Sequence, residues 1–164
     1  MADDATPTNI RVAYPERDGI DIPNASLRAF CEHCLAVKPP DDYAERRHFD
    51  FAQLKSWLGY IMILDYLPAE DDFRYRLYGT HIADHVGFDL TGTLVGAMPH
   101  GLREFVARNY RESVERKAVL YTEHTRNYPR FTRDWHRVLC PVRDGDDIQV
   151  VTCNIPVNTL ERAP

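Results

Sequence analysis

The hydrophobic and polar positions of the chain follow two different periods. Between residues 27 and 35 the apolar residues recur at intervals of three and four, the spacing of one face of an α-helix. In the stretch Phe73–Tyr78 apolar and basic residues alternate, which indicates a β-strand. A second helical stripe follows Pro99, and three runs rich in strand-forming residues come after it. The pattern therefore predicts an α+β fold.

The expected elements form a simple order along the chain. We expect helices over residues 26–37, 50–59, 80–86 and 99–114, and strands over residues 60–67, 73–78, 118–128, 134–143 and 148–157. Ser26 is the expected N-cap of the first helix, and Asp50 with Gln53 has the spacing of a capping box. The turn at Asp144 and Gly145 joins the last two strands as a hairpin. We therefore expect a five-stranded antiparallel sheet with helices on one face and an N-terminal flanking helix.

The segment between residues 79 and 92 contains three glycines around a short helical piece. Gly79 is expected to let this helix cross close to a strand, and Gly87 suits a left-handed helix end. Asp89 or Thr91 can cap the next turn of the chain. This segment is first of all a corner of the fold.

The same segment resembles a known family. "YRLYGT", residues 75–80, followed by "FDLTG", residues 88–92, resembles the signature of a bacterial PAS family, the PAS_5 type. "FDF" at residues 49–51 and "RVLCPVRDG" at residues 137–145 are similar to its other landmarks. The resemblance covers residues 26–157, which we expect to be a single domain between a mobile lead-in, residues 1–25, and a tail, residues 158–164. It implies a sensory or protein-association module rather than an enzyme.

In a PAS domain a ligand would lie between the sheet and a helical wall. We expect a small and mostly apolar ligand. The candidate lining residues are Met62, Leu64, Tyr75, Leu77, His85, Phe105, Tyr110, His136, Val138, Cys140, Val151 and Cys153. Ordinary core packing is the alternative interpretation of each, and a shift of one residue would turn a strand's whole set to the other face.

Composition and charge restrict the possible partners. The chain of 164 residues has 44% hydrophobic and 27% charged residues, as ordinary globular proteins do. Its net charge of −5 argues against a non-specific nucleic-acid surface. No apolar run is long enough for a membrane span, and the acidic, polar start does not resemble a signal peptide. We expect a cytoplasmic protein.

An enzyme is the main alternative function. Small cone-shaped isomerase-like folds also combine a curved sheet with helices and place an acidic or histidine base on a strand. Asp65 and His136 are the candidate bases here. Because those folds usually begin with long helices, the order of elements favours the sensor.

Two short motifs have the spacing of metal ligands. His81 and His85 are four residues apart on one helix face, which would suit a metal or a haem iron. Cys31 and Cys34 have zinc-like spacing, but no second such pair accompanies them. We expect neither a metal nor another cofactor.

The first helix carries an apolar stripe that must be buried. The stripe consists of Leu27, Phe30, Cys31, Cys34 and Leu35. A helix of this length is marginal alone in water. The stripe must therefore cover the outer sheet face, pack on a second subunit, or do both. We expect a homodimer with this stripe at its centre, and signalling through that dimer or a separate partner protein.

Overall fold

Seven strands form one open sheet in the computed structural model, which describes residues 6–161 except the side chain of residue 100. The strands are β1 (Thr8–Ala13), β2 (Ala44–Glu45), β3 (Ile61–Leu67), β4 (Asp72–Tyr78), β5 (Leu120–Asn127), β6 (Phe131–Asp144) and β7 (Asp147–Glu161). Their order across the sheet is β1-β5-β6-β7-β3-β4, and all these neighbours are antiparallel. The short β2 runs parallel to β6.

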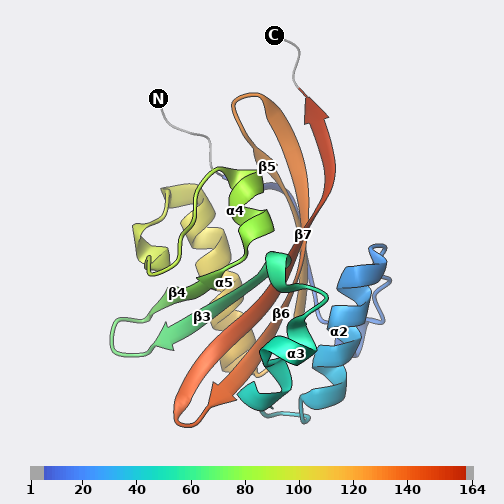
Figure 1. The fold of residues 1–164 in the computed structure, drawn as a ribbon, viewed down its shortest axis with the longest axis vertical. Coiled ribbons are helices and arrows are strands. Elements are labelled where there is room, and N and C mark those ends of the chain that lie inside the picture. The colour runs from blue at the N-terminus through green and yellow to red at the C-terminus, as the bar shows by residue number, and fades with distance from the viewer. Residues whose placement is uncertain (1–5, 162–164) are drawn as a thin grey trace.

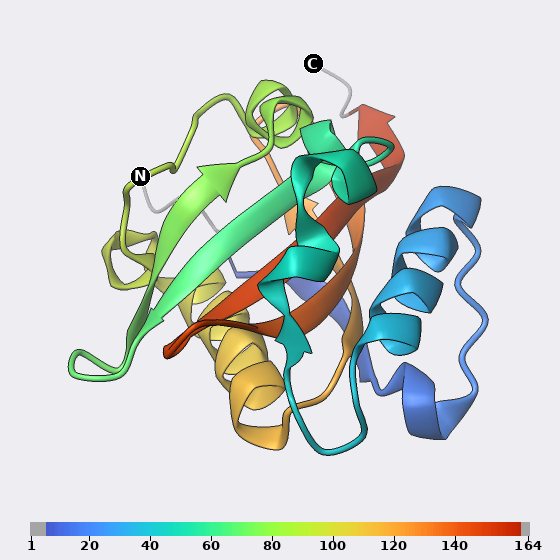
Figure 2. The same ribbon diagram turned by 60° about the horizontal axis from the view of Figure 1, so that its bottom comes forward.

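Helices lie on both faces of this sheet (Figures 1 and 2). The α-helices are α1 (Pro15–Asp18), α2 (Ala25–Val37), α3 (Phe51–Leu54), α4 (Thr80–Val86) and α5 (His100–Arg116). Three 3-10 turns are η1 (Arg46–Phe49), η2 (Leu58–Tyr60) and η3 (Val95–Ala97). Helices α2 and α3 pack on one face, and α4 and α5 pack on the other. The α+β class is confirmed. The expected placement of the helices holds for α4 and α5 on one face and for the flanking α2, but α3 departs from it by packing on the α2 face.

The central strands explain the two helical layers because they are apolar on both faces. On β3, Ile61 and Ile63 belong to the core under α2, whereas Met62 and Leu64 belong to the core under α5. Successive side chains of a strand point to opposite faces. A strand that is apolar at every position therefore needs a cover on each side.

The expected five strands omitted β1 and β2. In β1, Val12 pairs with Thr122 of β5, and only Ala13 of the strand is buried. An edge strand held mainly by backbone hydrogen bonds needs no apolar alternation, so the sequence pattern did not indicate it. The expected mobile lead-in thus contains a paired strand and α1, while residues 1–5 lie outside the described residues. Strand β7 also runs to Glu161, into the expected tail, and residues 162–164 are not described.

The helix caps agree in part with the sequence. The capping box of α3 is confirmed: Asp50 Oδ1 accepts a hydrogen bond from the Gln53 backbone N at 3.0 Å, and Gln53 Oε1 accepts one from the Asp50 N at 3.2 Å. The N-cap of α2 is Asn24 rather than Ser26, because Asn24 Oδ1 accepts from the Leu27 backbone N at 2.9 Å. Asn and Ser are about equally good at this position, so composition alone does not distinguish them.

The glycine-rich corner has the expected geometry. A Cβ built on Gly79 would lie 2.4 Å from the carbonyl oxygen of Gly59, so the two backbones cross in direct contact. Gly87 ends α4 with a φ of 88°. Asp89 Oδ1 accepts hydrogen bonds from the backbone N and the Oγ1 of Thr91, at 2.8 and 2.7 Å. The corner holds α4 above the sheet face that α5 also covers. Within residues 6–161 no helix has the length and apolar character required to cross a membrane.

Candidate ligand-binding cavity

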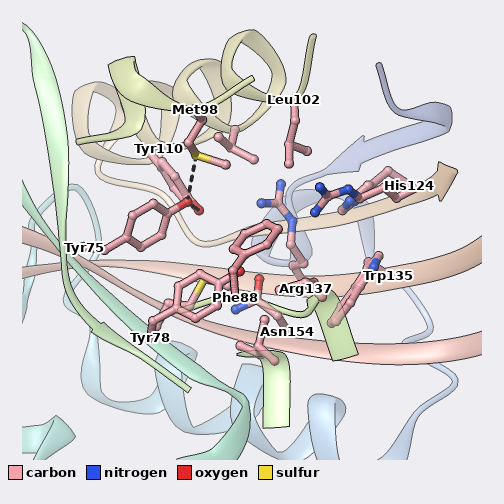
Figure 3. Close-up of a pocket in the computed structure, with 15 residues that line it drawn as sticks. Tyr75, Tyr78, Phe88, Met98, Leu102, Tyr110, His124, Trp135, Arg137 and Asn154 are labelled. Carbon is pink, nitrogen blue, oxygen red and sulfur yellow. Dashed lines mark hydrogen bonds between the residues drawn. The ribbon is translucent and has the colours of Figure 1, made fainter. Parts of the chain in front are cut away.

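A partly open cavity lies between the sheet and the layer formed by α4 and α5 (Figure 3). About 460 Å³ there is free of protein atoms, its mouth included, and about 50 Å³ can be reached by the centre of a water molecule. The lining consists of Met62, Tyr75, Tyr78, Ile82, Val86, Phe88, Met98, Leu102, Val106, Tyr110, His124, Arg126, Trp135, Arg137 and Asn154. The space holds a few water molecules, or a small organic molecule if the flexible lining moves.

One wall of the cavity is apolar and adaptable. Ile82 and Val86 come from α4, Met98 precedes α5, and Met62 rises from β3. Methionine side chains have three rotatable bonds and fill irregular spaces. Phe88, from the loop after α4, lines the cavity and stays 41% exposed. The rotatable side chains of this wall can therefore adjust to the shape of a bound molecule.

Two tyrosine hydroxyls meet at the centre of the core under α5. The Tyr75 Oη lies 3.4 Å from the Tyr110 Oη and 3.5 Å from the Met98 Sδ (Figure 3). Burial raises the pKa of both Tyr75 and Tyr110, so both stay protonated near neutral pH. They can donate a hydrogen bond to a ligand.

Arg137 extends from β6 into the cavity. Its Nε donates a hydrogen bond to Thr122 Oγ1 at 2.9 Å, and its Cζ lies 5.0 Å from the centroid of the Phe105 ring. Its Nη2 is buried and has no hydrogen-bond partner among the described residues. Burial lowers the pKa of Arg137, although the Tyr110 and Tyr75 hydroxyls offset part of this effect. A guanidinium group nevertheless remains charged in proteins.

His124 and Arg126 line the same side of the cavity from β5. The ring centroid of His124 lies 4.9 Å from that of Phe105, and its Nδ1 has no partner among the described residues. Burial, and then the positive charges of Arg137 and Arg126, hold the pKa of His124 well below its usual value. The Cζ of Arg126 lies 4.8 Å from the Tyr128 ring centroid. His124 is therefore neutral beside two cations.

The structure places only part of the expected lining at the cavity. Met62, Tyr75 and Tyr110 line it. Leu64 and Phe105 belong to the same core without lining the cavity. The expected lining residue His85 does not line it either; its ring lies 6.2 Å from that of Trp135, centroid to centroid.

The expected lining from β6 and β7 is on the wrong face. Val138, Cys140, Val151 and Cys153 all belong to the core under α2. His136 also points that way, since its Nδ1 lies 3.0 Å from the Oη of Tyr121, a residue of the same core. The lining residues are their neighbours Trp135, Arg137 and Asn154. On each of these two strands the expected positions are therefore displaced by one residue, which assigns them to the opposite face of the sheet.

Leu77 is misplaced for a different reason, a β-bulge. Ile63 pairs with Leu77, whereas the next residue, Leu64, pairs with Tyr75, so Arg76 is an extra residue in β4. The bulge reverses the alternation after Tyr75. Leu77 is consequently 37% exposed, and Tyr78 lines the cavity in its place.

Most of the polar lining was not predicted from the sequence. The lining residues that were not among the expected pocket residues are Tyr78, Ile82, Val86, Phe88, Met98, Leu102, Val106, His124, Arg126, Trp135, Arg137 and Asn154. On β5 the alternating residues Thr122, His124 and Arg126 are buried and share one face. Alternating polar residues usually indicate a solvated face, so this signal points away from a cavity.

The residues expected for the alternative functions, acid/base catalysis and metal binding, do not lie together at this cavity. Asp65 accepts hydrogen bonds from Arg76 and Gln149 at 2.9 and 2.8 Å, and neither Asp65 nor His136 lines the cavity. His81 packs on Tyr60, with ring centroids 4.9 Å apart. Within residues 6–161 no three histidine, cysteine or acidic side chains are grouped so that they could hold a metal ion.

The stripe of α2 packs on the chain's own sheet. Leu27, Phe30, Cys31 and Cys34 are buried among residues of β3, β6 and β7, and Leu35 is partly buried beside them. The cysteines of the described chain are free and buried, and burial raises the pKa of Cys31 to about 12. Of the alternatives for this helix, the outer sheet face is therefore correct. The stripe does not form the centre of a dimer interface, because the sheet of the same chain already covers it; the homodimer itself stays a prediction.

We compared the chain with known protein families, curated proteins and solved structures, and none of the three comparisons found a match.

Proposed function

We propose that this protein is a PAS-like sensory module that binds a small, mostly apolar molecule in the cavity under α4 and α5. The observation that carries the proposal is a partly open cavity with an apolar wall from α4 and its flanking loop on one side and the sheet on the other. Binding sites for small molecules are typically concave, mostly apolar, and furnished with a few polar groups. The "YRLYGT" and "FDLTG" motifs support the PAS interpretation because they build the corner that positions α4.

The sensory part of the proposal depends on the wall. The loop after α4 contacts the edge of β4, where the Gly92 N donates to the Tyr75 carbonyl at 2.7 Å and the Tyr75 N donates to the Thr93 carbonyl at 3.0 Å. A ligand that moves Val86 or Phe88 would therefore strain this loop. We propose that a cytoplasmic, non-catalytic domain passes such a change to a second copy or to a partner protein.

Methyl NMR tests ligand binding directly. The chain has three methionines, of which Met62 and Met98 line the cavity and Met1 lies outside the described residues. With 13C-methyl methionine, titration with 1-hexanol should shift the Met62 and Met98 signals together and saturably. Shifts that stay linear up to the solubility limit would contradict the proposal. Native mass spectrometry with an absorption spectrum of the purified protein would show any molecule that copurifies.

A matched pair of variants on α5 separates the cavity from ordinary core. Val106 lines the cavity, whereas Val114 is buried on the same helix without lining it. Val106→Phe should abolish hexanol binding and cost little stability, because the ring enters existing space. Val114→Phe should destabilise the protein by about 1–3 kcal/mol through overpacking and keep the binding in the folded fraction. Equal loss of stability in both variants would indicate that the space beside Val106 is as tightly packed as the core around Val114 and cannot admit a ligand.

A further inference from the structure

The polar side of the cavity is positively charged, and the lining residues within the described part of the chain include no acidic side chain to balance this charge. Arg137, Arg126 and His124 are 3%, 8% and 6% exposed. Each has one buried nitrogen that finds no hydrogen-bond partner among residues 6–161: Nη2 of Arg137, Nε of Arg126 and Nδ1 of His124. The ion pairs seen within residues 6–161 involve neither Arg126 nor Arg137.

Such an arrangement is costly for the protein alone. A buried charge is usually paired, because removal of its hydration shell is compensated only by a counter-charge and hydrogen bonds. Here the neighbours of Arg137 are neutral: Thr122, Phe105 and Tyr110. His124 cannot compensate, since it has no negative form near neutral pH. An anion in the cavity would supply the missing charge.

We infer that the ligand of this cavity is a small organic acid, whose carboxylate pairs with Arg137 and whose apolar part lies against Met62, Ile82 and Tyr78. The inference rests on the proposed ligand-binding function and names the class of ligand. Figure 3 shows Arg137 reaching into the space that Phe88, Leu102 and His124 surround. The structure thus presents a cationic group and an apolar wall to the same small volume.

The geometry favours a carboxylate over other anions. The Nε of Arg137 is already bonded to Thr122, so its Nη2 remains to meet an oxygen. A carboxylate is planar and accepts such charge-assisted hydrogen bonds, and the Tyr110 hydroxyl beside Arg137 can donate another. Arg126 stacks on Tyr128 and adds positive charge without being the main donor. The remaining lining is mostly apolar and suits the hydrocarbon part of a monoanion rather than the many oxygens of phosphate.

The test compares hexanoate with 1-hexanol, which has the same chain length and no charge, and with inorganic phosphate at constant ionic strength. The Met62 and Met98 methyl signals report each titration. We expect hexanoate to bind at least tenfold more tightly than hexanol, and phosphate not to shift these signals saturably. Equal affinities for hexanoate and hexanol would overturn the inference and leave the proposed function standing. Saturable phosphate binding tighter than that of hexanoate would also overturn it, and failure of both six-carbon probes would overturn it together with the proposed function.

Variants on β6 assign the charge to one residue. Arg137→Met should reduce hexanoate affinity at least tenfold and leave hexanol affinity unchanged or higher. Arg143→Gln is the matched control: it removes the same charge from the same strand, where Arg143 pairs with Asp42 on the surface at 3.2 Å. It should not alter either affinity. Retained hexanoate affinity in Arg137→Met would overturn the inference. If the Met variant does not fold, Arg137→Lys replaces it: lysine keeps the positive charge but lacks the planar guanidinium group, so this variant should bind hexanoate with intermediate affinity.

Discussion

Replacement of Gly79 by alanine should destabilise this protein strongly, although the backbone at that residue is ordinary. Gly79 has φ −58° and ψ 137°, which any L-residue adopts. The difficulty is space: the new Cβ would lie 2.4 Å from the carbonyl oxygen of Gly59 and 2.8 Å from that of Ile61. Both contacts are with backbone, so no side chain can rotate away. Either η2 or the start of α4 must move.

The expected cost follows from this overpacking. Alanine would gain about 0.4–1 kcal/mol from a less flexible unfolded chain, but a forced backbone shift costs about 1–3 kcal/mol or more. We expect a net loss of about 1–2 kcal/mol for Gly79→Ala and about 2–4 kcal/mol for Gly79→Val, measured by denaturant unfolding with unchanged m-values. The control is Gly145→Asn in the β6–β7 turn, where φ is 61° and a Cβ would meet nothing within 4 Å. Asparagine tolerates this conformation, so the control should cost less than about 1 kcal/mol. If Gly79→Ala unfolds at the midpoint of the wild type, the two backbones do not cross in contact.

Three further predictions concern stability. Burial, and then the charges of Arg137 and Arg126, lower the pKa of His124 in the folded state, whereas in the unfolded state this pKa is about 6.5. At a pH between these two values His124 is protonated only in the unfolded state, which favours unfolding. The free energy of unfolding should therefore fall from pH 7 to pH 5, by up to about 1.4 kcal/mol per pH unit, and His124→Asn should flatten this slope; an equal slope in the variant would refute the assignment. Phe30 is fully buried, so Phe30→Ala should cost about 3–5 kcal/mol in denaturant unfolding, whereas Phe51 is 73% exposed and Phe51→Ala should cost less than about 0.5 kcal/mol. Similar losses in the two variants would mean that α2 does not pack on the sheet. Asp50→Ala should cost about 0.5–2 kcal/mol through loss of the capping box, and no measurable change would show that the box is not formed in solution.

The sequence predicted those features that local chemistry determines. The helical stripe of α5, the hairpin turn at Gly145 and the left-handed end of α4 at Gly87 depend on residues close together in the chain. The capping box at Asp50 is equally local. Such features are formed by neighbouring residues, so periodicity and turn chemistry are sufficient to predict them.

The face of each strand could not be predicted in the same way. Strands β6 and β7 are buried on both faces, so hydrophobicity does not distinguish Val138 from Leu139 or Val150 from Val151. Only the helix that covers each face decides, and that is a tertiary property. In β4 the extra residue Arg76 forms a bulge, so the side chains after it point to the face opposite to the one that simple alternation predicts.

The stripe of α2 illustrates how a correct pattern can support a wrong interface. Its spacing required burial, and both a second subunit and the outer sheet face would have met that requirement. In the structure the outer sheet face buries the stripe, since Ile61, Val138 and Cys153 form an apolar surface on that face. The sequence analysis expects Val138 and Cys153 to line the cavity, on the opposite face of the sheet. With these residues placed there, no apolar surface is expected under α2, and a second subunit is needed to bury the stripe.

The two faces of the same strands differ in their chemistry, and this difference supports the proposed binding role of the α5 face. Tyr121 and Val138 contribute to a close apolar core under α2, whereas the adjacent Thr122 and Arg137 turn to the face under α5. Apolar residues in place of a buried, unpaired cation are often neutral or stabilising, so stability gives no reason for arginine at this position. A binding role accounts for that cost, because a counter-charge would be supplied only when a ligand is present. The α5 face is therefore where variation of side chains should alter binding, while variation on the α2 face should alter stability alone.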